Sequence, residues 1–189
     1  MIRSSFTRYG AQASARRQTE TTMIVYKDRF NGDELASDSF PVKDTGLFLE
    51  VDCKTVSRQK VGSLSGAGLD GGDGSDAEAE AGEVIAVIDL VGETRMVETS
   101  YDRKSYLGHI KAYTSRLRQV VAEGGDQNVE EWQTAVAEEV NRVVASFGDW
   151  KFYTGESMDP DAMVPLLGRR EDGQMYFRFF KDGLVTEEH

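Results

Sequence analysis

Two helical segments joined by a glycine-containing link constrain this chain more than any other feature. Apolar residues recur at every third or fourth position from about Asp102 to Glu123 and from about Asn128 to Phe147, which predicts one buried face on each helix. The link at 124–126 reads Gly-Gly-Asp, and so short a turn predicts an antiparallel αα-hairpin over residues 102–147. Ser100 is expected to cap the first helix.

Strand-like segments precede and follow this hairpin. They are short and rich in β-branched or aromatic residues, and they comprise Met23–Tyr26, Leu47–Val51, Val84–Leu90, Trp150–Thr154, Met163–Leu167, Met175–Phe180 and Leu184–Thr186. Val84–Leu90 is apolar almost throughout, which predicts a buried strand, while Asp172-Gly173 and Asp182-Gly183 predict hairpin turns. A sheet that is interrupted by a helical hairpin and then completed predicts an α+β fold.

Residues 62–83 form a glycine-rich, acidic segment without Lys or Arg. Leu64 and Leu69 are its only large apolar residues, so it cannot repay the entropy of ordering, and we expect a long mobile loop. Clustered carboxylates attract hard cations, so weak Ca²⁺ binding is the alternative to a merely solvated linker. The candidate ligands are Asp70, Asp73, Asp76, Glu78 and Glu80.

Residues 1–22 differ in composition from the rest of the chain. They carry four arginines against a single acid, Glu20, and show no helix or strand pattern. Two interpretations stay open: a disordered extension or the product of an upstream start codon on one side, and a transit-like targeting segment on the other. The folded domain is expected from residue 23 to residue 188.

Composition excludes several classes of function. The net charge of −11 disfavours nucleic-acid binding, because the field of the chain repels phosphates. No apolar run is long enough to span a bilayer, so no membrane insertion is expected. Cys53 is the only cysteine, expected to be a structural or surface thiol, and His109 and His189 are the only histidines. We therefore expect an intracellular protein-interaction domain that needs no cofactor and is not an enzyme.

The first helix concentrates positive charge in an otherwise acidic chain. Its five basic and two acidic residues give a net charge of +3, which leaves −14 for the rest. Lys104, Lys111 and Arg118 are seven residues apart and therefore share one helix face, with Arg103 and Arg116 adding charge nearby. This face is either simply solvated or a docking stripe for an acidic partner.

Several segments together resemble the translationally controlled tumour protein family. The most specific is Phe147–Val164, FGDWKFYTGESMDPDAMV, which is similar to the second signature sequence of the family. The others are 23–28 (MIVYKD), 33–38 (DELASD), 46–51 (GLFLEV), 98–100 (ETS), 170–173 (REDG) and 179–184 (FFKDGL).

Three positions depart from the family pattern. The first signature is degenerate at Gly71–Gly74, and Arg169 stands where the second signature ends in an aromatic residue. The chain ends at His189 without the C-terminal cysteine of some relatives, so disulfide dimerisation by that route is unavailable and a monomer is expected.

The resemblance implies a β-tent fold like that of Rab exchange factors, without their zinc cysteines, and with a protruding helical hairpin. It also implies a cytoplasmic protein with calcium-binding and microtubule-associated roles in growth control. Tubulin and microtubules are the implied acidic partners of the basic helix. The alternatives are a guanine-nucleotide exchange factor or regulator for a small Ras-like GTPase, and a low-affinity calcium buffer.

Two glutamates are the candidates for contact with a GTPase. Glu34 matches the family position implicated in binding a small Ras-like GTPase, and Glu156 lies in the second signature. We expect both in one acidic patch beside the sheet, although Glu34 has the alternative of being an ordinary loop carboxylate.

Overall fold

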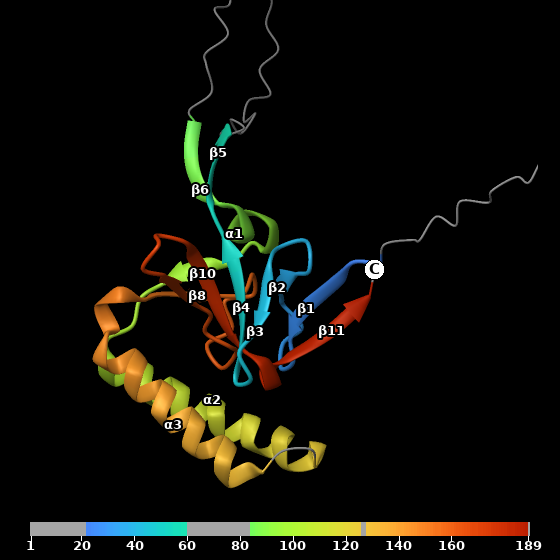
Figure 1. The fold of residues 1–189 in the computed structure, drawn as a ribbon, viewed down its shortest axis with the longest axis vertical. Coiled ribbons are helices and arrows are strands. Elements are labelled where there is room, and N and C mark those ends of the chain that lie inside the picture. Colours follow the sequence, from blue (N-terminus) through green and yellow to red (C-terminus); the bar gives the residue numbers. More distant parts are fainter. Residues whose placement is uncertain (1–21, 60–83, 126–127, 189) are drawn as a thin grey trace, which may run out of the picture.

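The computed structural model describes residues 22–59, 84–125 and 128–188, in which three antiparallel sheets and a helical hairpin are found (Figure 1). The smallest sheet is a ribbon of β5 (Thr55–Gln59) and β6 (Val84–Ile88), which projects from the end of the molecule opposite the hairpin. Residues 1–21 and the predicted loop 62–83 lie outside the described residues, so their predicted disorder stays a prediction.

The two larger sheets form the body of the fold. In the three-stranded sheet, β1 (Ile24–Asp28) lies between β2 (Glu34–Ser37) and β11 (Leu184–Glu188), so the two ends of the folded chain pair with each other. The six-stranded sheet contains, in spatial order, β3 (Val42–Asp44), β4 (Phe48–Cys53), β10 (Met175–Phe180), β9 (Leu166–Arg169), β8 (Lys151–Thr154) and β7 (Val97–Thr99).

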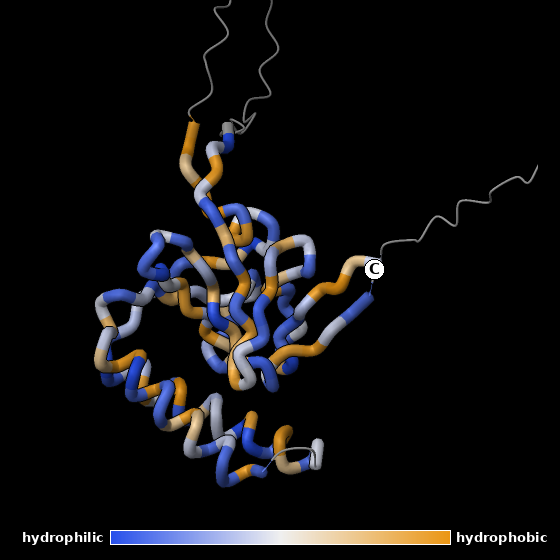
Figure 2. The backbone as a smooth tube through the Cα atoms, in the orientation of Figure 1, coloured by the Kyte–Doolittle hydropathy of each residue, from blue (hydrophilic) through white to orange (hydrophobic). Residues whose placement is uncertain are grey.

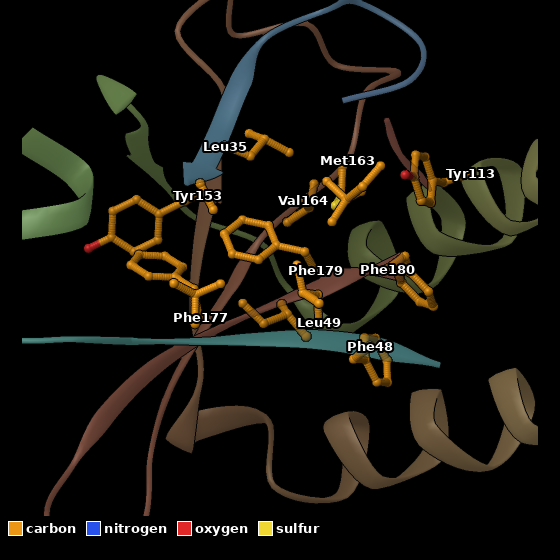
Figure 3. Close-up of a cluster of buried hydrophobic side chains, with 14 of the residues drawn as sticks. Leu35, Phe48, Leu49, Tyr113, Tyr153, Met163, Val164, Phe177, Phe179 and Phe180 are labelled. Carbon is orange, nitrogen blue, oxygen red and sulfur yellow. The ribbon is translucent and has the colours of Figure 1, made fainter. Parts of the chain in front are cut away.

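The paired strands β4 and β10 are buried on both faces, which makes them the centre of the structure. Phe177 and Phe179 are fully buried on one face, where they pack with residues such as Leu35 and Met163 (Figure 3). Phe180 and its register partner Phe48 point to the other face, with ring centroids 4.7 Å apart. Because successive strand residues alternate between faces, β10 can serve both cores at once.

The helical hairpin consists of α2 (Arg103–Gly124) and α3 (Val129–Ala145), and both helices lie within two residues of the predicted ranges. Apolar and hydrophilic residues alternate along both of them (Figure 2). Asn128 caps α3, and Gly125 ends α2 with a φ of 71°, a left-handed conformation that glycine adopts without strain. The predicted αα-hairpin and the α+β class are therefore confirmed.

The predicted cap of the first helix is wrong. Asp102, not Ser100, is the N-cap, and its carboxylate accepts a hydrogen bond of 2.7 Å from the backbone N–H of Ser105. The Ser105 hydroxyl in turn accepts from the backbone N–H of Asp102, which completes a capping box. Ser100 and Asp102 both belong to residue types that commonly cap helices, so residue type alone does not decide which of them is the cap.

The strand predicted over Val84–Leu90 is present but shorter, and the prediction that it is buried is wrong. β6 ends at Ile88, and the side chains of Val84 and Ile85 are 63% and 39% exposed. β6 pairs with β5 alone among the described strands, and its apolar run is visible on the projecting ribbon in Figure 2. Leu90 instead belongs to the short helix α1 (Asp89–Thr94), which the sequence pattern did not predict. A short apolar run in the sequence does not show whether other elements of the fold cover the strand.

Turns were predicted with mixed success. Asp172-Gly173 does connect the antiparallel strands β9 and β10, and Gly173 has a φ of 89°. Asp182-Gly183, however, lies in a 3-10 turn, Lys181–Gly183, between strands of two different sheets, so it is not a hairpin. The predicted strand Met163–Leu167 begins only at Leu166, because Met163 and its neighbours pack as irregular, buried chain.

The 3-10 turn packs tightly against α2, which gives a testable constraint. A Cβ on Gly183 would lie 2.1 Å from the Tyr113 hydroxyl oxygen and 2.7 Å from the terminal methyl group of Met163. Among the described residues that buried hydroxyl has no hydrogen-bond partner, and its burial raises the pKa of Tyr113 well above the usual value.

We expect Gly183→Ala to lower the free energy of unfolding by roughly 1–3 kcal/mol, the usual cost of overpacking a core. Tyr113→Phe should be close to neutral by itself, since it removes an unpaired hydroxyl, and it should restore part of the loss in the double variant. Urea denaturation of the two single variants and the double variant measures the coupling. Additive effects within about 0.5 kcal/mol would contradict the contact.

Candidate functional site

The outer face of α2 carries the predicted basic stripe. Lys104, Lys111 and Arg118 are all exposed, whereas the buried residues of the helix, from Tyr106 to Val121, point toward the body of the protein. Arg103, the first residue of α2, is exposed as well. The stripe therefore presents its charges to solvent along the length of the helix.

Arg116 does not belong to the exposed stripe. Its guanidinium donates a hydrogen bond of 2.7 Å to the backbone carbonyl of Asp161 and lies 3.8 Å from the centroid of the Phe30 ring. Both contacts are internal, so Arg116 serves to hold α2 against the loop before β9. Its place on the helix could be predicted from spacing, but its two partners are distant in sequence.

A groove runs between α2 and α3, with a volume of about 1060 Å³. Its apolar lining includes Leu107, Val129 and Val140, and Leu107 is 42% exposed. Lys111 and Arg118 of the stripe line the α2 side of the same groove. The stripe is thus the charged wall of a partly apolar surface.

The loop at residues 155–163 connects α2 to the sheets. His109 donates a hydrogen bond of 3.1 Å from Nδ1 to the carbonyl of Pro160, since a carbonyl oxygen can only accept. At the other end of the loop, the backbone N–H of Met163 donates to the Asp28 carboxylate over 2.7 Å. Asp28 is 1% exposed, and this burial raises its pKa although two backbone N–H groups stabilise its charge.

The residues next to Glu34 and Glu156 are in direct contact. The Asp33 carboxylate accepts hydrogen bonds of 2.6 Å from the Ser157 hydroxyl and 3.2 Å from the Ser157 backbone N–H. Glu34 and Glu156 are both exposed beside this junction, and Glu156 forms an ion pair of 2.8 Å with Arg95. The structure therefore brings the neighbouring residues together, but the charge of Glu156 is partly neutralised.

The glycine of this junction has no room for a side chain. A Cβ on Gly155 would lie 2.1 Å from an Asp33 carboxylate oxygen, so only glycine permits this approach. Gly155 lies in the 147–164 segment, and the contact gives a physical reason for its residue type.

The described part of the chain shows neither a cluster of metal ligands nor an activated cysteine. There, no group of three or more His, Cys, Asp or Glu side chains is arranged to hold a metal ion. The calcium candidates from Asp70 to Glu80 lie outside the described residues, so weak Ca²⁺ binding stays a prediction. Burial, with Asp89 and Asp52 nearby, raises the pKa of the Cys53 thiol to about 12, which keeps it protonated.

No described helix is long and apolar enough to cross a membrane.

Comparison with known proteins agrees with this geometry. The family model for translationally controlled tumour protein matches residues 23–185. The chain belongs to this family. The translationally controlled tumour protein homologue of Schizosaccharomyces pombe is 38% identical over 168 residues, covering 88% of this chain and 99% of the homologue. The homologue of Lateolabrax japonicus is 39% identical over 171 residues, and the mouse protein is 36% identical over 172 residues.

Solved structures of the family match the fold. The Schizosaccharomyces pombe protein p23fyp has a TM-score of 0.73 at 38% identity and covers 88% of this chain and 99% of that one. The translationally controlled tumour protein of Caenorhabditis elegans has a TM-score of 0.64 at 23% identity, which supports the fold alone. The family resemblance and the β-tent with its inserted hairpin are therefore confirmed.

In this translationally controlled tumour protein relative, the most specific sequence segment is also the one that joins the two halves of the molecule. Residues 147–164 run from the end of the hairpin through β8 to the Asp33 junction and the His109 contact. The sequence did not predict the Asp33–Ser157 junction, the His109–Pro160 contact or the groove. One feature of the sequence could have indicated the groove. Leu107 lies four residues before Lys111, so an apolar side chain is a neighbour of the basic residues on the helix surface.

The His109 contact predicts a specific pH dependence of stability. Burial lowers the pKa of His109, while the Pro160 carbonyl and Asp161 oppose this shift. The neutral ring is thus favoured in the folded state. Above the unfolded pKa of about 6.5 its contribution is complete, and as the pH falls below that value the unfolded state takes up the proton first, so stability is lost.

His109→Phe, which keeps an aromatic ring beside Tyr101 and Tyr113, lacks this titration. We expect the wild type to lose stability relative to the variant between pH 7.5 and pH 5.5. Urea denaturation of both proteins at the two pH values measures the difference. An unchanged difference would show that His109 titrates equally in both states.

Proposed function

We propose that this chain is an interaction protein that binds acidic protein surfaces, those of tubulin among them, through the basic stripe Lys104, Lys111 and Arg118. The observation that carries the proposal is the exposed alignment of these three cations in a chain whose net charge is −11. A concentrated positive face in a negative protein orients an acidic partner toward one side. The family resemblance supports tubulin as that partner.

Binding by this stripe is modest, collective and sensitive to salt. Each contact between exposed charges contributes about 0–1 kcal/mol, and screening acts over roughly 10 Å at 0.1 M salt. Measurable binding therefore requires contacts from all three cations at once. Arg103 adds to them at the start of α2, whereas Arg116 is committed to Asp161 and Phe30.

Charge reversal tests the stripe. Replacing Lys104, Lys111 and Arg118 together by Glu should abolish co-sedimentation with microtubules, because the attraction becomes repulsion. The matched control reverses Lys43, Lys54 and Arg169, three exposed basic residues of β3, the β4–β5 link and β9. It changes the net charge equally and should bind as the wild type does.

Circular dichroism shows whether the helices of both variants are intact. Co-sedimentation of the stripe variant at wild-type level would overturn the proposal, and so would binding that survives half-molar salt. Equal loss in both triple variants would mean that net charge alone, without a defined face, drives binding.

A second candidate function is contact with a small Ras-like GTPase, either as an exchange factor or as a regulator. It is favoured by the Asp33–Ser157 hydrogen bond, which holds the strand start at Glu34 beside the loop that carries Glu156. Such contact requires no covalent chemistry from this chain. Glu34 is the stronger candidate of the two, since Glu156 is paired with Arg95.

Glu34→Val should reduce the ability of this chain to stimulate nucleotide release from the GTPase while leaving the fold intact, because Glu34 is exposed at the first position of β2. Release of a fluorescent guanine nucleotide from the GTPase measures the effect. Glu171→Val removes the same charge from the β9–β10 turn and should have no effect. Stimulation by the Glu34 variant equal to that of wild type would remove this candidate.

The remaining parts of the proposal follow from the resemblance. We propose that the protein acts in the cytoplasm, in growth control, as a monomer and without catalysing a reaction itself. Any Ca²⁺ that it binds through Asp70 to Glu80 would be held weakly, because flexible carboxylates pay an ordering cost on binding.

A further inference from the structure

We propose that the groove between α2 and α3 binds an amphipathic helix of a partner protein, with acidic residues on the side of that helix that faces α2. The charged half of this inference rests on the proposed function, and the apolar half is independent of it. Helices that lay an apolar face into a groove are a common mode of recognition.

The groove lies on the outer side of the hairpin, because the inner side is occupied by the body of the protein. Tyr113 packs against Phe30 and Phe180, with ring centroids 5.6 and 5.9 Å away. On α3, the Trp132 indole N–H donates to Asp182 over 2.8 Å. These contacts hold both helices from one side and leave the surface between them on the other side open.

Apolar side chains from both helices line the groove. They are Leu107 and Ile110 from α2, and Val129, Trp132, Val136 and Val140 from α3. Leu107 is 42% exposed, whereas five other residues of this helix are buried. A surface that exposes apolar atoms in a groove of about 1060 Å³ has the size and chemistry to receive side chains.

The two walls of the groove differ in charge. The α2 wall contains Lys111 and Arg118, whereas the α3 wall contains the uncharged residues Gln133, Ala137 and Asn141, with Glu130 at one end. An occupant with acids on one flank would pair with the α2 wall and meet no repulsion from most of the α3 wall. A second copy of this chain fits less well, because its own groove presents the same basic wall.

Helix geometry fixes the spacing of the ligand. The α2 lining extends from Leu107 to Ala122, about 22 Å at 1.5 Å per residue, which matches a partner helix of about 15 residues. Lys111 and Arg118 are two helical turns apart on one face, so a helix lying along α2 would meet them with acids seven residues apart. Apolar residues three and four positions from those acids would reach the floor.

Two synthetic peptides of identical composition test this inference with the full chain. The first places leucines on one helix face and two glutamates seven residues apart on its flank, and the second scrambles the order. Fluorescence anisotropy should show at least about tenfold tighter binding of the patterned peptide, and circular dichroism should show that it becomes helical on binding.

Blocking variants locate the binding surface. Ala137→Trp fills the groove and Leu107→Gln makes its floor polar, so each should weaken the patterned peptide about tenfold or more and leave the scrambled peptide unchanged. Ala112→Trp adds the same bulk to an exposed position of α2 that does not line the groove, and it should have no effect. Two blocking sites keep the test decisive if one variant folds poorly.

The outcomes separate this inference from the proposed function. If both peptides bind equally and neither blocking variant weakens binding, the groove proposal is overturned. In that case, loss of binding of both peptides in the Lys104, Lys111 and Arg118 reversal would still support the stripe. If that reversal leaves the patterned peptide bound as tightly as the wild type binds it, the charged half of the inference is overturned, whereas the co-sedimentation experiment decides the proposed function separately. Self-association that Ala137→Trp abolishes, measured by analytical ultracentrifugation, would assign the groove to a second copy and overturn the proposal.

Discussion

The ion pairs of Arg178 connect the central strand pair to the helical hairpin, and the arrangement of the hairpin depends on them. The Arg178 guanidinium donates a hydrogen bond of 3.1 Å to Glu50 on β4 and one of 3.2 Å to Glu139 on α3. The side chains of Arg178, Glu50 and Glu139 are 16%, 9% and 14% exposed. Each glutamate has a second ion pair, Glu50 with Arg170 and Glu139 with Arg142, so these five side chains form one connected network. Arg178 also lies over the Phe48 ring, 4.5 Å from its centroid, so charge and packing act at the same place.

The turn after β10 is the second point on which the two halves depend. Lys181 donates its backbone N–H to Leu47 beside the six-stranded sheet, while Arg29 of the β1–β2 link donates to the carbonyl of Asp182. The Asp182 carboxylate also accepts the Trp132 indole N–H from α3. Lys181 and Asp182 together thus connect both sheets and the hairpin. This is why the chain cannot form a simple hairpin at Asp182-Gly183, as the sequence pattern alone would suggest.

Local pattern predicts the elements of this fold whose length and periodicity are unambiguous. The two helices and β10 follow directly from it, since 3.6-residue periodicity persists over many turns and β10 is bounded by clear turn residues. The strands β2, β3, β5 and β7 were not predicted, because each of them contains a single large apolar residue and so shows no strand pattern. At the candidate site, spacing places Lys104, Lys111 and Arg118 on one face. The partners of Arg116 and the groove beside Leu107 exist only once distant segments have packed, so no spacing rule reveals them.

The same ion pairs that hold α3 in place also shape the electrostatics of the outer surface. α3 is rich in acids, which could have cancelled the positive charge of α2 across the groove. Glu139 instead turns inward to Arg178 and also pairs with Arg142, while Glu138 lies within 4.0 Å of Arg142. Because these acids are engaged away from Lys111 and Arg118, the wall of α3 that lines the groove stays mostly uncharged. The ion pairs that hold α3 in place therefore also keep the positive charge of the groove on its α2 side, where the proposed acidic partner would bind.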